Sequence, residues 1–121
     1  MEISQLIGQT LSSVTVYESN DEIIFITTEG KGYRMYHCQE CCENVEIEDI
    51  SGDLNDLVGA PILQAEESIN EDEGPVPSEH YESFTWTFYK LATVKGYVTI
   101  RWLGESNGFY SEGVDFVKLG Y

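Results

Sequence analysis

The residues between 37 and 42 form the densest set of side chains that could do chemistry. They include His37, Cys38, Cys41 and Cys42. The Cys38-x-x-Cys41 spacing is that of half a zinc knuckle, and thiolate and imidazole are ligands that zinc prefers. A small zinc-binding protein centred on this cluster is therefore one alternative function. A structural site normally takes a second ligand pair from elsewhere, and His80 is the only other histidine or cysteine, so we expect no metal and no other cofactor.

The same cysteines could instead act as nucleophiles. Cys41 or Cys42 could pair with His37 or His80 in a cysteine–histidine arrangement. No pattern in the sequence supplies an orienting third group or an oxyanion loop, and surrounding carboxylates raise the pKa of a thiol and oppose its ionisation. We therefore expect no enzymatic activity. The simpler interpretation is that the cysteines are reduced and that Cys41 or Cys42 packs into the core as a small apolar residue.

Alternation of apolar and polar residues predicts that strands position this cluster. One hairpin is expected over residues 22–37 and a longer one over residues 83–102, each with a turn that contains glycine. In the longer hairpin, Phe84, Trp86 and Phe88 alternate with polar residues. We therefore expect an aromatic face that is turned toward the core.

Weaker patterns fill the rest of the chain. The sequence predicts strands near residues 14–16, 43–50 and 114–119, short helical segments within 3–13 and 54–58, an exposed loop over 70–80, and either a strand or a short helix over 62–69. The chain should therefore form a single domain (residues 1–121) of mainly β class. We expect a single curled antiparallel sheet or a small barrel or sandwich, with six to eight strands and one or two short helical segments, and α+β as the alternative.

Composition limits the classes of function. The chain has 121 residues, 22 acidic and 6 basic, and a net charge of −16. This charge opposes direct binding to nucleic-acid phosphates or to an anionic membrane. No basic residue precedes Lys31, and the longest apolar run is Ile23 to Ile26, so we expect a cytoplasmic protein without a leader or a membrane span.

The acidic residues are concentrated in the middle of the chain. Residues 35–89 hold 14 of the 22 acids and no lysine or arginine. Such a run can simply keep a protein soluble, or it can dock on a basic partner. On a regular strand, Glu46 and Glu48 would share one face with a separation of about 6.6 Å, which is of the order of successive phosphates. The expected partner-binding residues are Glu46, Glu48, Asp49, Asp53, Asp56, Glu66, Glu67, Glu71, Asp72 and Glu73.

One set of segments includes residues 41–43, 45, 47–49 and 52–54, with 84–86, 101–102 and 107–108 further along. These segments resemble a small uncharacterised family found in bacterial and bacteriophage genomes. No activity is assigned to that family, so the resemblance implies no catalytic residue. It implies a setting in which short phage proteins inhibit host defence machinery.

We therefore expect a non-enzymatic acidic interaction protein that is phage-encoded in that setting. It would mimic nucleic acid and occlude the basic, nucleic-acid-binding surface of a host protein such as a defence nuclease. The sequence leaves its oligomeric state open, because exposed edge strands could pair while the net charge opposes association.

Overall fold

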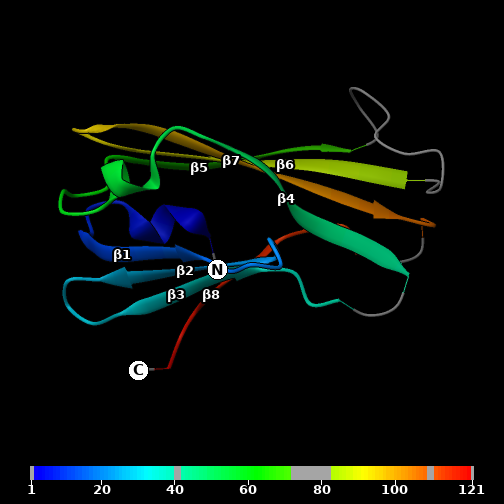
Figure 1. Cartoon of the computed structure of the whole chain (residues 1–121), viewed down its shortest axis with the longest axis horizontal. Helices are drawn as coiled ribbons and strands as arrows, with labels where there is room; N and C mark the ends of the chain where they lie inside the picture. Colours follow the sequence, from blue (N-terminus) through cyan, green and yellow to red (C-terminus); the bar gives the residue numbers. More distant parts are fainter. Residues whose placement is uncertain (1, 40–41, 72–82, 109–110, 121) are drawn as a thin grey trace.

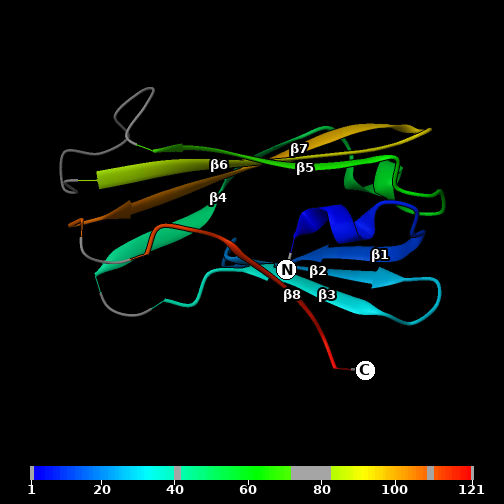
Figure 2. The same ribbon diagram turned by 180° about the vertical axis from the view of Figure 1, so that it is seen from behind.

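The computed structural model describes residues 2–39, 42–71, 83–108 and 111–120. Strands dominate this part of the chain, and they form two four-stranded antiparallel sheets in the orders β1-β2-β3-β8 and β4-β7-β6-β5. The sheets lie face to face as two layers (Figures 1 and 2). The elements in chain order are η1 (Ile3–Leu6), β1 (Leu11–Val16), β2 (Glu22–Thr27), β3 (Gly32–Tyr36), β4 (Glu43–Ser51), η2 (Leu54–Leu57), β5 (Gln64–Glu71), β6 (Ser83–Thr93), β7 (Gly96–Ser106) and β8 (Asp115–Lys118).

This arrangement confirms the predicted mainly-β class, in its sandwich form. The eight strands and two short 3₁₀ helices of the described residues lie within the predicted numbers. The ambiguous segment 62–69 falls largely in strand β5, where Ala65 pairs with Leu91. The sequence predicts a loop over residues 70–80. Residues 70–71 form the end of β5, and residues 72–80 lie outside the described residues.

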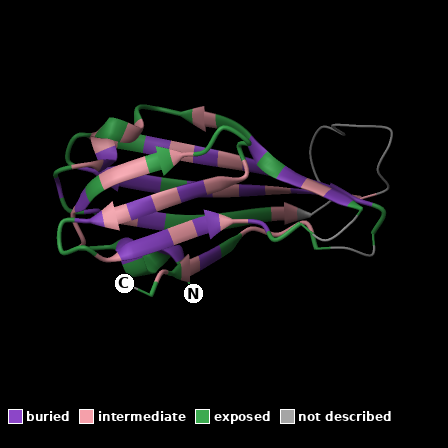
Figure 3. Ribbon diagram, turned by 60° about the horizontal axis from the view of Figure 1, so that its bottom comes forward, coloured by how far each residue is buried: buried purple, intermediate pink, exposed green. Residues whose placement is uncertain are grey.

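The core lies between the two layers and is built from the inward residues of both sheets (Figure 3). In the first sheet, the predicted hairpin forms from β2 and β3, and Phe25 and Met35 are completely buried. In the second sheet, Trp102 is also completely buried. Its indole Nε1 donates to the sulfur of Met35 at 3.3 Å. This contact joins β3 to β7, so the largest side chain of the core connects the two sheets.

In the long β6–β7 hairpin, strand β6 turns the opposite side toward the core from the one that its aromatic pattern predicts. Its two-residue turn pairs Thr93 with Gly96, and the same register places Thr87 opposite Trp102. Because directly opposite residues project from the same side of a sheet, Thr87 shares the inner side with Trp102. Phe84, Trp86 and Phe88 therefore lie on the outer side, where each is half-buried. The expectation of an aromatic inner face on β6 is wrong, because the register of the hairpin takes precedence over the hydrophobicity of these three residues.

The helix η1 lies between β5 and the first sheet (Figures 1 and 2). Its apolar residues Ile3 and Leu6 are buried in the shared core. After the helix, the Gly8 amide donates to the Ile62 carbonyl at 2.8 Å, and the Ile62 amide donates to the Gln9 carbonyl at 2.9 Å. These bonds hold the N-terminal segment against the start of β5.

Candidate interaction surface

A row of apolar side chains covers part of the outer side of the second sheet. Phe84, Trp86 and Phe88 follow one another along β6, and Leu103 lies opposite Trp86 on β7. All four are half-buried. We name these four residues the aromatic stripe. The solvent side of an antiparallel sheet is normally polar, and apolar surface rimmed by polar residues is typical of a protein-binding site.

Arg101 connects the aromatic stripe to the acidic residues of β4. Its guanidinium carbon lies 5.4 Å from the centre of the Trp86 ring, within the range of a cation–π contact. Its Nε donates to Glu48 Oε2 at 2.5 Å, and its Nη2 contacts the same oxygen. Both side chains of this ion pair are more than one-third exposed. The pair therefore adds little stability, but it holds a cation over the indole.

Three of the predicted partner-binding acids lie together beside the stripe. Glu46 is opposite Leu103 and Asp49 is opposite Arg101, and Glu48 lies between them where the register shifts. All three are exposed, and we name them the acidic edge. This shift in register is a β-bulge, and it interrupts the alternation of inward and outward side chains along β4. Glu46 and Glu48 therefore do not form the evenly spaced, phosphate-like row that a regular strand would give.

Asp53 and Asp56, two other predicted acids, do not join this group. Asp53 caps η2, where its side chain accepts from the Asn55 amide at 2.9 Å. Asp56 lies within η2, and its carbonyl accepts from the Thr93 hydroxyl. These two residues therefore shape the turn that follows β4. The side chain of Glu71, together with Asp72 and Glu73, lies outside the part of the chain that the structure describes.

The two acids of β5 lie at the opposite edge of the sheet from β4. Three strand spacings separate the two edges, a distance of about 14 Å. Glu66 pairs with Lys90 on the outer side, and Glu67 pairs with Tyr89 on the inner side. Those acids of the middle of the sequence that the structure describes therefore do not form one contiguous patch, because strand order separates residues that are close in the chain.

The described residues of the histidine–cysteine cluster do not converge on a metal site. His37 is buried, with its Nδ1 2.7 Å from the Gly113 carbonyl and its Nε2 3.3 Å from Glu43 Oε1. Both ring nitrogens are thus already engaged. No group of three potential ligand residues occurs within the described ranges. The imidazole is a structural link between β4 and the segment before β8.

Of the two described cysteines, one is the reduced thiol that the sequence predicts, and the other differs from the interpretation as a reduced core residue. Cys38 is a free thiol and is exposed. Cys42 is exposed and disulfide-bonded, so the expectation of reduced thiols is wrong at this position. Cys41 lies outside the described residues. Cys38 and Cys42 are exposed because they belong to the connection from β3 to β4, and connections between sheets run over the surface.

The segment between β7 and β8 packs closely against the second sheet. Glu112 accepts hydrogen bonds from the Thr85 hydroxyl at 2.7 Å and the Ser106 hydroxyl at 2.5 Å. A Cβ atom on Gly104 would lie 2.3 Å from the carbonyl oxygen of Glu112. A glycine is therefore required at position 104 for this approach. The hydroxyl groups hold the Glu112 carboxylate in place, which gives it a structural role.

A second group of polar side chains lies on the inner side of β5 and β6, and the sequence patterns do not reveal it. Tyr89 is completely buried, and its hydroxyl group has no hydrogen-bond partner. Burial raises the pKa of Tyr89, and the nearby carboxylates of Glu67 and Asp115 raise it further. Glu67 acts on the hydroxyl both as a nearby hydrogen-bond acceptor and as a charge, although no hydrogen bond of standard length and angle joins the two groups. The signal that could have revealed this group is the alternation of Tyr89 and Leu91, which continues the inward side of β6.

Comparisons with known proteins give one match. The model of a domain family of unknown function, DUF7448, matches residues 4–116. Searches of curated proteins and of solved structures found no match to the chain. As for membranes, the described residues contain no helix with the length and apolar character of a membrane span.

Proposed function

The chain belongs to the DUF7448 family of domains of unknown function, and we propose that it is a non-enzymatic protein that binds a basic surface of a protein partner. The contact surface would be the outer side of β4, β7 and β6. It would consist of the aromatic stripe and the acidic edge, with Arg101 between them. The observation that carries this proposal is the outward position of Trp86 and Phe88 on β6, with the exposed carboxylates of β4 on the other side of the intervening strand β7.

The composition of this surface supports binding to another protein. Aromatic residues and arginine are enriched in protein interfaces, and tryptophan and arginine are frequent among the residues that dominate binding energy. Trp86 and Arg101 already contact each other, so little side-chain entropy would be lost when a partner covers them. The aromatic stripe would supply affinity, and the acidic edge would supply orientation.

The charge of the chain supports a basic partner. A net charge of −16 produces a long-range field that accelerates association with a cationic surface. Surfaces that bind nucleic acid are strongly basic, so the partner class we propose is a nucleic-acid-binding protein such as a defence nuclease of a host cell. Bound there, the chain would compete with nucleic acid for the cleft.

The experiment uses the immobilised chain in a bacterial lysate, followed by binding measurements on the purified partner. A stripe variant (Trp86→Thr with Phe88→Thr) and an edge variant (Glu46→Lys with Asp49→Lys) test the two parts of the surface. A control, Glu18→Lys with Glu29→Lys, makes the same change in charge at exposed positions in the two turns that connect β1, β2 and β3. We expect each test variant to weaken binding at least about tenfold, and the control to bind as the wild type does.

Two further measurements decide the mechanism. Double-stranded DNA should displace the chain from its partner, because both would occupy the same cleft. Raising the salt concentration to about 1 M should slow association strongly. A partner that binds the stripe and edge variants as tightly as the wild type would contradict the proposed surface. A partner that binds DNA and the chain at the same time would contradict occlusion.

A further inference from the structure

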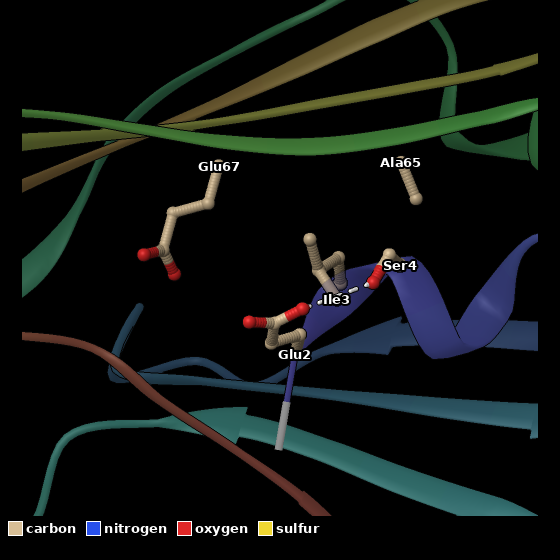
Figure 4. A pocket seen from close by; sticks show the side chains of 5 residues that line it. All are labelled: Glu2, Ile3, Ser4, Ala65 and Glu67. Atoms are coloured by element: carbon tan, nitrogen blue, oxygen red, sulfur yellow. Dashed lines mark hydrogen bonds between the residues drawn. The ribbon is translucent and has the colours of Figure 1, made fainter.

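A hollow of about 350 Å³ opens between η1 and the edge strand β5, away from the aromatic stripe. Its described walls come from Glu2, Ile3 and Ser4 on one side and from Ala65 and Glu67 on the other. Figure 4 shows the carboxylates of Glu2 and Glu67 directed into the same space. This volume is at the small end of the range for ligand sites.

The polar groups around the hollow can all accept hydrogen bonds. Glu2 and Glu67 are carboxylates, and neither forms an ion pair with a residue that the structure describes. The Ser4 hydroxyl is 3.5 Å from Glu2 Oε2, so this contact is long. A ligand that satisfies such a set must donate hydrogen bonds and carry positive charge.

The buried Tyr89 hydroxyl is an independent indication of a ligand. Tyr89 lies opposite Glu67 on the neighbouring strand, so its side chain leaves the sheet on the inner side that Glu67 shares. It is completely buried, and its oxygen has no hydrogen-bond partner. A buried polar group without a partner is costly in an isolated fold. The Glu67 carboxylate acts on this hydroxyl, so a donor bound at Glu67 would lie on the same inner side of the sheet.

We propose that this hollow binds a guanidinium group, supplied by an arginine side chain of the basic partner. Two carboxylates from opposite walls match the planar, donor-only guanidinium. The apolar side chains of Ile3 and Ala65 would contact the aliphatic part of the arginine. This inference rests on the proposed function for the source of the arginine, but the chemistry of the hollow can be tested without any partner.

The test uses N-butylguanidinium and its neutral isostere N-butylurea as probes of the whole chain. Amide chemical shifts are followed by NMR during titration with each compound. We expect N-butylguanidinium to shift the amides of Ser4, Ala65 and Glu67, and N-butylurea to leave them unchanged. Glu67→Gln should weaken binding of N-butylguanidinium about tenfold, as expected for the loss of one charge-assisted hydrogen bond.

Glu66→Gln is the matched control, because it removes the same charge from the adjacent residue on the outer side of β5. It should bind the probe as the wild type does. Equal weakening in both variants, shifts spread over other surfaces, or equal binding of N-butylurea would each overturn the inference. A response of the same amides to Mg²⁺ but not to N-butylguanidinium would also overturn it, in favour of a metal ion.

The effect of these variants on partner binding distinguishes a failure of this inference from a failure of the proposed function. If Glu67→Gln weakens partner binding while Glu66→Gln does not, the hollow contributes to the interface. If the stripe variant abolishes partner binding and Glu67→Gln has no effect on it, the proposed function stands and the arginine assignment fails.

Discussion

Thr87 of β6 lies directly opposite Trp102 of β7, and both side chains are buried between the sheets. The two-residue turn at Val94 and Lys95 sets this register. It turns Trp86 to the outer side, where Arg101 covers its ring. The two tryptophans of the chain therefore have different roles: Trp102 supports the fold, and Trp86 is available to a partner.

The two tryptophans should respond differently to truncation. Trp102→Ala should lower the free energy of unfolding by about 3–5 kcal/mol, because it opens a cavity in the core and removes the contact with Met35. Trp86→Thr should lower it by only about 1 kcal/mol, since Trp86 is half-buried on the outer side. Chemical denaturation of both variants checks this. Equal losses would contradict the assigned inner and outer sides.

Gly104 should not tolerate a side chain. A Cβ at this position would meet the backbone oxygen of Glu112 at 2.3 Å, and backbone cannot move aside as a flexible side chain can. Gly104→Ala should therefore lower the free energy of unfolding by about 3 kcal/mol. Gly113→Ala is the matched control, because its Cβ would meet nothing closer than 3.7 Å and should cost no more than about 0.5 kcal/mol. Denaturation midpoints of the pair give the comparison.

Removal of the Tyr89 hydroxyl should stabilise the fold. The group is buried without a hydrogen-bond partner, so Tyr89→Phe should raise the free energy of unfolding by about 1 kcal/mol at neutral pH. Tyr17→Phe, at an exposed tyrosine, should leave it unchanged. If Tyr89→Phe proves destabilising, the hydroxyl must form a favourable contact in the free protein.

The same substitution should change the response to alkaline pH. Burial raises the pKa of Tyr89 in the folded chain, so the unfolded chain loses this proton first as the pH rises past about 10. Titration of Tyr89 therefore leaves the free energy of unfolding of the wild type unchanged well below that pH and lowers it above that pH. The stability advantage of Tyr89→Phe over the wild type should therefore widen above about pH 10. A constant difference between pH 8 and pH 11 would contradict the raised pKa.

Loss of the His37 imidazole should destabilise the sandwich. The ring contacts both the Gly113 carbonyl and the buried Glu43 carboxylate. His37→Ala would remove this partner from a carboxylate held away from water, at an expected cost of about 3 kcal/mol. Cys38→Ala, at the exposed neighbouring residue, should change stability by less than about 0.5 kcal/mol. Thermal unfolding distinguishes the two, and similar effects would argue against a structural role for the imidazole.

The acidic edge and the β5 acids illustrate why the sequence alone does not show which of the predicted binding residues share a surface. Glu46 and Glu66 belong to one acidic stretch of sequence, yet β7 and β6 pair between their strands. Strand order arises from pairing between distant segments, which the composition of a segment does not specify. The bulge at Glu48 is a similar case, because no glycine or proline in β4 announces it.

The sequence by itself determined the local features of this protein: the β class, the two hairpins, the short helical turns and the large negative charge. Each depends on alternation, turn chemistry or composition within a few residues of the chain. Only the tertiary structure decided which side of β6 faces the core, which acids share a surface, and that Glu2 and Glu67 face one hollow. These features depend on the register and order of paired strands, and a shift of one residue in register exchanges the buried and exposed sides of an entire strand.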